Sequence, residues 1–358
     1  MTPERGQEVE RVYHAALERR EDVRAAFLAE ACGGDEALRR EVESLLAQAG
    51  ATSAFLESPA MAGASAAPVA ARPLVGRRLG PYVVRSVLGV GGMGEVYEAE
   101  HLDTHRRVAL KVLNHTLGTE ADRLRFLREG QLAASINHPN SLCIFGTEEI
   151  DGRLAISMEI ANGGTLKDVV HAGGPMPVAA AVDAILQVIN GLEAAAAAGV
   201  LHREIKPSNC FVDGDGGVKI GDFGLSIATA GQGETQLTVP GTLLCTPAFA
   251  PPEQIRGGTL DVRSDIYSTG ATLYYVLTGQ PPFAGDGVVQ LVADVLERDA
   301  DSPTRLTPDL PHGLATIVQR CLAKDPAARL GRWEFLFMAS APRIPGISSA
   351  PFNPLAIF

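Results

Sequence analysis

Two short stretches decide the fold: Leu201–Asn209, which reads LHREIKPSN, and Asp222–Gly224, which reads DFG. Asp222 follows Asn209 by 13 residues, and both side chains carry hard oxygen atoms. Such oxygens suit Mg²⁺, which proteins usually hold through one or two carboxylates together with substrate phosphates. A DFG tripeptide alone carries little information, because many loops contain Asp and Gly. The interpretation therefore depends on what precedes these stretches.

A glycine-rich stretch lies upstream at Gly89–Gly94, with the pattern GxGxxG. Glycine lets backbone amides approach phosphates closely. A dinucleotide-binding fold uses the same pattern, but it requires a helix to begin at the glycines. The residues that follow, Glu95–Glu100 and Val108–Lys111, read instead as two strands. The sequence therefore predicts a hairpin lid over phosphates.

Lys111 ends the second of these strands, 17 residues after the last glycine of the motif. An amine on an inner strand is costly to bury alone, so it requires a phosphate, a carboxylate or both. Glu129, in the helical segment Phe126–Glu129, is the candidate carboxylate. A surface salt bridge is the alternative for any single Lys or Glu, and the nearby glycine-rich lid weakens that alternative.

These four motifs, in this order and spacing, resemble those of the bacterial eukaryotic-like Ser/Thr protein kinases, within the protein kinase superfamily. The resemblance covers about residues 80–330. It implies an α+β, bilobal fold, with a β-rich N-lobe that carries one helix and a helical C-lobe. ATP would bind between the lobes, and the γ-phosphate would pass to a Ser or Thr hydroxyl of a protein substrate.

The resemblance also implies a role for each matched residue. The catalytic set comprises Glu204, Lys206, Asn209, Asp222, Lys111 and Glu129, of which Asn209 and Asp222 bind Mg²⁺ (or Mn²⁺). The ATP-binding set comprises Leu88, Gly89, Gly91, Gly94, Val96, Ala109, Lys111, Met158, Glu159 and Ala161.

Within these sets, Lys111 would hold the α- and β-phosphates and pair with Glu129 of the single N-lobe helix. Met158 would be the gatekeeper. The backbones of Glu159 and Ala161 would bond adenine.

Other matched residues support the C-lobe. Glu253, in the segment that reads APPE, would pair with Arg329, and Asp265 would cap the catalytic-loop backbone. Lys206 stands two residues past the catalytic acid, where the resembled family places the lysine that distinguishes Ser/Thr kinases from tyrosine kinases.

The main departure from the family is Glu204, which stands where the family has Asp. The two acids have similar pKa values near 4, so the acid–base chemistry survives. The extra methylene moves the carboxylate by about 1 Å, and a misplacement of that size can cost about 100-fold, or about 2.7 kcal/mol. We expect a slow but active kinase. The alternative is an ATP-binding pseudokinase or signalling scaffold, and a small-molecule kinase is more distant.

The activation loop, about residues 225–250, offers Thr235, Thr238 and Thr242 as phosphorylation sites. A phosphothreonine adds nearly two negative charges and could bridge to Arg203. Autophosphorylation in trans, through self-association, is therefore expected. Thr246 is expected to hydrogen-bond the catalytic-loop lysine.

The chain divides by composition into four parts. Residues 1–58 are predicted to form a helical N-terminal module, 59–79 an Ala/Pro-rich linker, 80–338 the kinase domain and 339–358 a Pro-rich tail. For the N-terminal module, a regulatory docking role and a merely structural role stay equally open.

The formal net charge of −11 disfavours a general nucleic-acid binder. The first residues lack the basic and apolar regions of a secretory signal, and no apolar run of about 18 residues suggests a membrane span. Five scattered cysteines are typical of reduced thiols. A cytoplasmic location without membrane or nucleic-acid partners is expected.

Overall fold

The computed structural model describes residues 74–91, 94–113, 120–223, 246–285 and 287–331, together with six isolated residues nearer the N-terminus. By its contacts the chain divides into two compact units, Met1–Ser58 and Pro59–Phe358. Most of the predicted N-terminal module, residues 59–73 of the predicted linker and the C-terminal tail lie outside the described residues, and so do Thr235, Thr238 and Thr242. The last residues of the predicted linker, 74–79, are described, and Arg78–Leu79 form a strand of the sheet.

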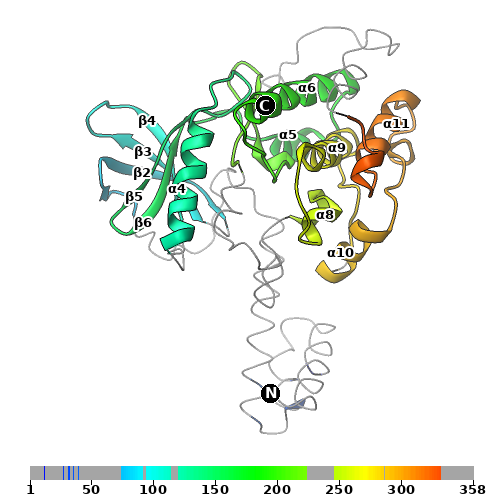
Figure 1. Cartoon of the computed structure of the whole chain (residues 1–358), viewed down its shortest axis with the longest axis horizontal. Helices are drawn as coiled ribbons and strands as arrows, with labels where there is room; N and C mark the ends of the chain where they lie inside the picture. The colour runs from blue at the N-terminus through cyan, green and yellow to red at the C-terminus, as the bar shows by residue number, and fades with distance from the viewer. Residues whose placement is uncertain are drawn as a thin grey trace. The chain divides into compact units, whose positions relative to one another are not determined.

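The N-lobe is one six-stranded antiparallel sheet in the order β1-β2-β3-β4-β6-β5, with a single helix, α4, between β4 and β5 in sequence (Figure 1). The elements are β1 (Arg78–Leu79), β2 (Tyr82–Gly91), β3 (Gly94–His101), β4 (Arg107–Leu113), α4 (Glu120–Ala134), β5 (Ile144–Ile150) and β6 (Arg153–Met158).

Alternate residues of β4 lie in two different hydrophobic cores, because successive side chains of a strand point to opposite faces of the sheet. Val108, Leu110 and Val112 face a core enclosed within the N-lobe. Ala109 and Leu113 belong instead to the larger core that continues into the C-lobe. The face that carries Ala109 therefore turns toward the place where the two lobes meet.

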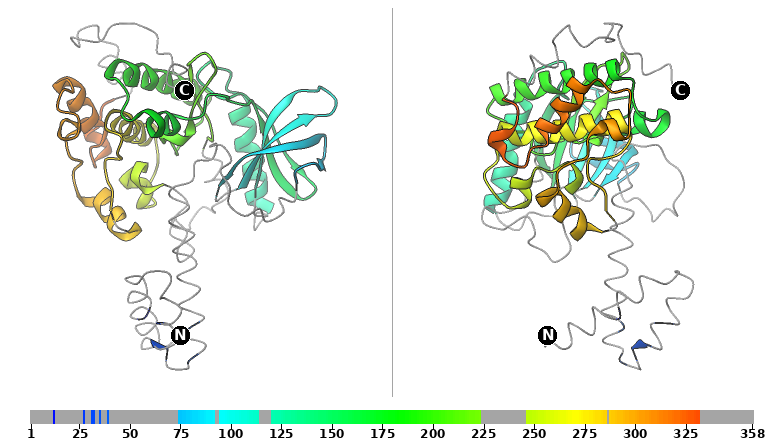
Figure 2. Two further views of the ribbon diagram at one scale, coloured as in Figure 1. Left: turned by 180° about the vertical axis from the view of Figure 1, so that it is seen from behind. Right: turned by 90° about the vertical axis from the view of Figure 1, so that its right-hand side faces the viewer.

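The C-lobe is helical, and its core is continuous with that second face of the sheet. The left view of Figure 2 shows, from behind, that the sheet with α4 and the group of helices form separate lobes. The helices are α5 (Leu166–Gly173), α6 (Val178–Ala197), α8 (Pro252–Ile255), α9 (Val262–Thr278), α10 (Val288–Glu297) and α11 (His312–Cys321), with short 3-10 turns at η1 (Pro207–Asn209), η2 (Pro247–Phe249), η3 (Pro303–Arg305) and η4 (Pro326–Ala328). A small hairpin, β7 (Cys210–Val212) and β8 (Val218–Ile220), completes the lobe.

Capping residues define where two of these helices begin. Thr165 caps α5 through a reciprocal box with Asp168, and Asp261 caps α9 through the same arrangement with Ser264. Such boxes satisfy backbone N–H groups that the first turn of a helix leaves without partners. Gly279 then ends α9 in the left-handed conformation that favours glycine.

Among the described residues, α6 is the one helix long and apolar enough to span a membrane by length and composition. Half of its most apolar window is buried inside the protein, as in the core helix of a folded domain, so the resemblance to a spanning helix is weak. The predicted α+β, bilobal architecture, with a strand-rich first part and a helix-rich second part, is confirmed.

Candidate active site

The loop between α6 and β7 brings the predicted catalytic acid and lysine together. Lys206 Nζ lies 2.6 Å from Glu204 Oε1 and 3.1 Å from Thr246 Oγ1, so the lysine bridges the catalytic loop and the end of the activation segment. Asn209 Nδ2 donates to the Glu204 carbonyl oxygen at 2.9 Å. The prediction that Thr246 bonds the catalytic-loop lysine is confirmed.

Asp265, at the start of α9, fixes this loop through hydrogen bonds to its backbone. Its two carboxylate oxygens accept the backbone N–H groups of His202 at 3.0 Å and Arg203 at 2.8 Å, as predicted. Burial raises the pKa of the Asp265 carboxyl, although the His202 and Arg203 contacts oppose the shift. His202 is itself buried, and its Nε2 lies 2.9 Å from the Gly221 carbonyl oxygen. The loop is therefore tied both to α9 and to the residue before Asp222.

The backbone is strained at two site residues. Arg203 has φ of 66° and Asp222 has φ of 58°, in the left-handed region that residues with side chains seldom adopt. Strain of this kind persists only where surrounding contacts impose it. Here the Asp265 carboxylate imposes it on Arg203.

Lys111 lies at the other end of the site, where it contacts Asp222. On β4 it stands opposite Val96 of β3 and Ile156 of β6, and its Nζ lies 2.8 Å from Asp222 Oδ1. Burial lowers the pKa of the Lys111 ammonium, but the Asp222 charge and hydrogen bond outweigh burial and raise it. Burial alone would raise the pKa of the Asp222 carboxyl. The charge and hydrogen bond of Lys111 outweigh burial and hold that pKa below its usual value.

The predicted Lys111–Glu129 pair is wrong for this conformation. Glu129 Oε2 lies 3.8 Å from Arg203 Nη1 instead, and Lys111 takes Asp222. The physical reason is that each group already has another partner of opposite charge: the Lys111 ammonium is paired with Asp222, and the Glu129 carboxylate is paired with Arg203. Arg203, expected to bind a phosphothreonine, contacts α4 instead.

The apolar residues predicted to bind adenine lie on one face of the sheet. Met158 pairs with Ala109 across β4 and β6, and both are buried, as is Val96. Leu88 packs against the same core.

The glycine-rich stretch forms the predicted β2–β3 hairpin, in which Gly89 pairs with Val96 and Gly91 pairs with Gly94. A Cβ at Gly94 would lie 2.2 Å from the Val112 carbonyl oxygen, so the close approach of β3 to β4 requires glycine there. Residues 92–93, at the tip, lie outside the described residues.

The segment after β6 offers backbone groups to a ligand. The Glu159 N–H donates to the Cys143 carbonyl oxygen at 2.9 Å, and among the described residues no hydrogen bond is made to the Glu159 carbonyl. In the part of the chain that the structure describes, no hydrogen bond uses the peptide groups of Ala161. Both residues therefore suit the adenine contacts expected of them.

Met158 lines a small apolar cavity. Phe223 forms part of its wall and contacts His202, with 4.8 Å between the ring centroids. The residues that line the cavity are Leu142, Ile144, Ile156, Met158, Gly221, Asp222 and Phe223.

The metal ligands predicted from the sequence are adjacent. The Gly221 N–H donates to the Asn209 carbonyl oxygen at 3.0 Å, which places Asp222 beside Asn209. Because Asn209 donates through Nδ2, its Oδ1 points away from the Glu204 carbonyl. An amide oxygen and a carboxylate at neighbouring positions fit Mg²⁺ that also binds phosphates. The described residues contain no cluster of three or more His, Cys, Asp or Glu that could hold a metal without phosphates.

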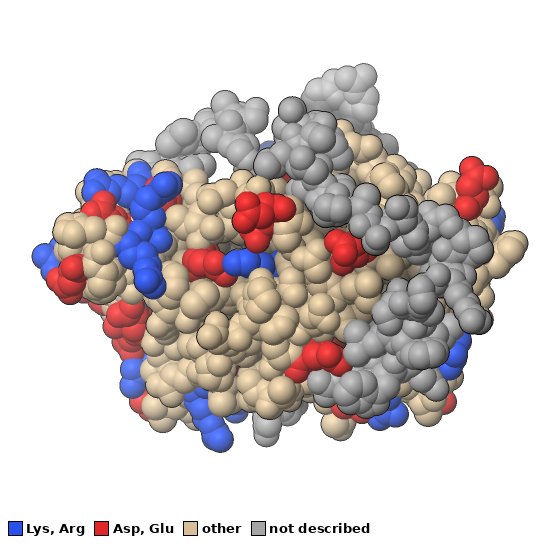
Figure 3. All heavy atoms as spheres, turned by 90° about the horizontal axis from the view of Figure 1, so that it is seen from above, with Lys and Arg blue, Asp and Glu red and all other residues tan. Residues whose placement is uncertain are grey.

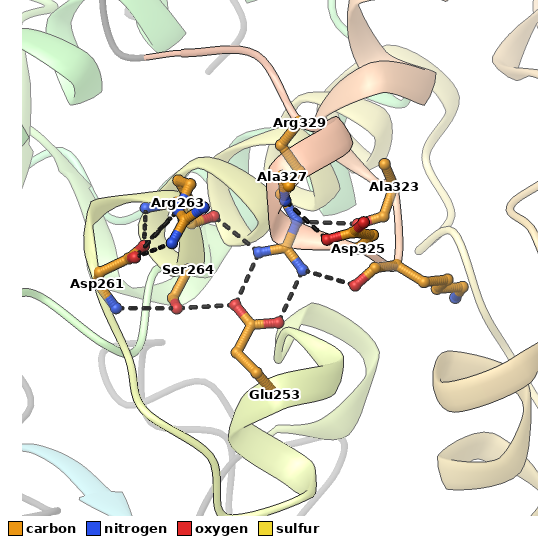
Figure 4. Close-up of polar contacts among 9 residues, drawn as sticks. Glu253, Asp261, Arg263, Ser264, Ala323, Asp325, Ala327 and Arg329 are labelled. Atoms are coloured by element: carbon orange, nitrogen blue, oxygen red, sulfur yellow. Dashed lines mark hydrogen bonds and ion pairs between the residues drawn. The ribbon is translucent and has the colours of Figure 1, made fainter.

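Glu253 and Arg329 form the predicted pair in the C-lobe (Figure 4). The two guanidinium nitrogens Nη1 and Nη2 each lie 2.7 Å from a carboxylate oxygen of Glu253. The remaining donors of Arg329 go to the carbonyl oxygens of Arg263, Ala323 and Lys324. The Arg329 side chain is fully buried, so α8 is fixed to the end of the lobe.

Sequence reasoning missed one residue of the site, Lys219 on β8, whose Nζ lies 2.9 Å from Glu159 Oε2. A lysine on a short strand carries no motif, and only the folded structure brings it to the segment after β6.

Comparison with known proteins agrees with this geometry. A sequence model of the protein kinase domain matches residues 82–339. The chain is 38% identical over 253 residues to serine/threonine-protein kinase PknB of Mycobacterium leprae (strain TN), an alignment that covers 69% of this chain and 40% of the relative. It is 35% identical over 258 residues to serine/threonine-protein kinase PrkC of Bacillus subtilis (strain 168), covering 72% of this chain and 39% of that protein. The chain thus spans about two fifths of the length of these relatives.

A solved structure supports the fold. Rad53 1-466 in complex with AMP-PNP superimposes with a TM-score of 0.60 at 24% identity, covering 72% of this chain and 64% of that one. Because the family match extends over most of the chain, the chain belongs to the protein kinase family and carries the kinase domain of a bacterial eukaryotic-like Ser/Thr protein kinase.

Proposed function

We propose that the protein is an ATP-dependent Ser/Thr protein kinase. The observation that carries the proposal is the cluster of Glu204, Lys206 and Thr246, joined by bonds of 2.6 and 3.1 Å, in the lobe that also carries the Asn209 and Asp222 oxygens. The relatives named above are Ser/Thr kinases, and the family uses ATP and a divalent metal in general.

In the proposed reaction a Ser or Thr hydroxyl oxygen of the substrate bonds to the γ-phosphorus, and the bond from that phosphorus to the β–γ bridging oxygen breaks. Glu204 orients the hydroxyl and receives its proton, while Lys206 stabilises the charge on the transferred phosphoryl group. Lys111 holds the remaining phosphates of ADP. Mg²⁺ bound by Asn209 and Asp222 would neutralise charge on the phosphates.

The glutamate slows this reaction rather than abolishing it. Glu204 Oε1 reaches Lys206 Nζ, so the longer side chain keeps the carboxylate within the cluster. A displacement of about 1 Å from the position that aspartate would give corresponds to about 100-fold in rate. The presence of Lys111, Lys206, Asn209 and Asp222, together with the hydrogen-bonded catalytic loop, favours an active enzyme over an ATP-binding scaffold.

Substrates are proposed to be proteins, and activation-loop phosphorylation in trans is proposed to regulate activity. Arg203 is partly exposed and already binds a carboxylate, so a phosphothreonine of higher charge can compete for it. A second copy of the chain would present the loop.

The location is proposed to be cytoplasmic, without nucleic-acid or membrane partners. On the face drawn in Figure 3, the Lys and Arg side chains are interspersed with Asp and Glu and form no extended basic surface. That pattern supports the absence of phosphate-backbone recognition.

The test is phosphate transfer from labelled Mg-ATP to a generic Ser/Thr protein substrate. Wild-type protein should transfer phosphate, and Lys111→Ala should abolish transfer because it removes the phosphate-binding amine. If both proteins are equally silent while ATP still raises the melting temperature of the wild type, the chain is an ATP-binding scaffold.

Glu204→Asp is the companion variant. We expect it to raise kcat by up to about 100-fold, because it returns the carboxylate to the position that the resembled family uses. A lower kcat with unchanged folding would show that the loop has adapted to glutamate.

A further inference from the structure

The Glu159 side chain, in the segment after β6, is held from two directions. Oε1 accepts the Cys143 backbone N–H at 2.7 Å, and Oε2 accepts Lys219 Nζ at 2.9 Å. With the bond from its own N–H to the Cys143 carbonyl, Glu159 is fixed at three points. A residue that is fixed at backbone and side chain has little freedom to rotate its carbonyl.

Lys219 comes from the other lobe. It stands opposite Phe211 on the β7–β8 hairpin, three residues before Asp222. Its ion pair with Glu159 is partly exposed, with 21% and 27% of the two side chains accessible. Pairs of this exposure contribute about 0 to 1 kcal/mol to stability. The contact therefore matters for the orientation of Glu159 rather than for the stability of the fold.

The segment before Cys143 is joined to the same hairpin. The Ile220 N–H donates to the Asn140 carbonyl oxygen at 2.9 Å, and the Leu142 N–H donates to the Ile220 carbonyl oxygen at 2.8 Å. Asn140 Nδ2 also donates to the Val218 carbonyl oxygen at 2.9 Å. Residues 140–142 and β8 thus form one unit, to which the Glu159 carboxylate attaches the segment between the lobes.

We propose that Lys219 is a positioning residue for the purine of the nucleotide: through the Glu159 carboxylate it fixes the Glu159 carbonyl as an acceptor for the amino group of adenine. The inference rests on the proposed function, which places adenine against Glu159 and Ala161. Lys219 itself touches no nucleotide atom. It orients the Glu159 carbonyl before the nucleotide binds, so that no binding energy is used to order this acceptor.

A fixed carbonyl also discriminates between purines. Adenine presents an N–H donor at the position where guanine presents a carbonyl oxygen. A buried acceptor held rigidly opposite guanine stays without a partner, which disfavours GTP. Loosening Glu159 lets its carbonyl turn away, so ATP loses affinity while GTP does not.

The test compares Lys219→Met with the wild type in the full chain. One hydrogen bond is worth about 0.5 to 1.5 kcal/mol, so we expect the KM for ATP to rise by about 2- to 10-fold. The KM for the protein substrate and kcat at saturating ATP should stay unchanged, and the preference for ATP over GTP in kcat/KM should fall by a similar factor. Calorimetry with ADP should give the same loss of affinity without turnover.

Two further variants separate positioning from folding. Lys219→Arg keeps a cation within reach of Glu159 and should restore most of the ATP preference. Arg153→Met, at the exposed far end of the β5–β6 hairpin, removes one positive charge without touching this contact and should leave every parameter unchanged.

The outcomes are distinguishable. If wild-type protein binds ADP but Lys219→Met leaves the ADP affinity and the ATP/GTP ratio unchanged, the inference is overturned and the proposed function stands. A rise in both KM values with a lower melting temperature, and no rescue by Lys219→Arg, assigns Lys219 to folding alone and also overturns it. Wild-type protein that binds no ADP overturns the proposed function and this inference together.

Discussion

Removing the Glu253 carboxylate should destabilise the C-lobe strongly. Arg329 has five N–H donors, and all five are satisfied, two of them by Glu253. Glu253→Ala leaves two donors and one full charge without a partner in a side chain that is fully buried. Breaking such a pair from one side costs about 3 to 5 kcal/mol.

The loss can be followed by thermal and urea unfolding of the full chain. A domain of this size loses about 2 to 4 °C per kcal/mol, so the melting temperature should fall by about 6 to 20 °C. The matched control is the double variant Glu253→Leu/Arg329→Met, which removes both charges. It should recover most of the loss, because apolar residues of similar volume often replace a buried pair without cost.

The reasoning is refuted if Glu253→Ala costs less than about 1 kcal/mol, or if the double variant is as unstable as the sum of the two single variants. In the first case water would hydrogen-bond the Arg329 guanidinium in place of Glu253. In the second case the two residues would act independently.

The same pair predicts a pH dependence. Burial alone would raise the pKa of the Glu253 carboxyl, but hydrogen bonds from Arg329, from its own backbone and from Ser264 hold it below its usual value. A lowered folded-state pKa gives stability that is present above the unfolded value of about 4.3 and is lost as the pH falls through the folded value. The stability difference between wild type and Glu253→Ala should therefore shrink below about pH 4 in urea unfolding measured against pH.

A crystal structure with Mg²⁺ and a non-hydrolysable ATP analogue should show Glu129 paired with Lys111 instead of Arg203. The reason is that the metal would then bind the Asp222 carboxylate, which Lys111 contacts without nucleotide. Glu129 still beside Arg203 would contradict this. Gly130→Ala should destabilise the N-lobe by about 1 to 3 kcal/mol in urea unfolding, since the added Cβ would lie 2.2 Å from the Thr147 Cγ2, and an overpacking cost of that order exceeds the gain of about 1 kcal/mol in helix propensity. An unchanged urea midpoint would mean that α4 shifts freely on β5.

Periodicity was enough to predict the type of the main elements. The pattern of Val108–Lys111 predicts a strand, and β4 covers it. The segment Phe126–Glu129 is predicted to be helical, and α4 covers it. Both signals are local, because an amphipathic pattern records which face of one element is buried.

The pairings across the site could not be predicted in the same way. Asp265 and Arg329 were assigned partners through resemblance to a family, since partners 62 to 76 residues apart leave no local signal. The Lys111–Glu129 pairing failed because Asp222 and Arg203 take these two groups in the folded chain, and partners 111 and 74 residues away leave no local signal. Lys219 went unnoticed for a related reason, because its function comes from contacts that exist only after the lobes meet.

The cavity lined by Met158 has a practical consequence for testing the proposed function. Met158 is buried and lines that cavity, and it is also one of the residues expected to bind ATP. Shortening this one residue, as in Met158→Gly, would enlarge that cavity. An ATP analogue with a bulky group on its amino nitrogen would then fit the variant and be excluded from enzymes that keep a large residue there. If the proposed kinase activity holds, phosphate transferred from that analogue in a cell extract would label the proposed protein substrates.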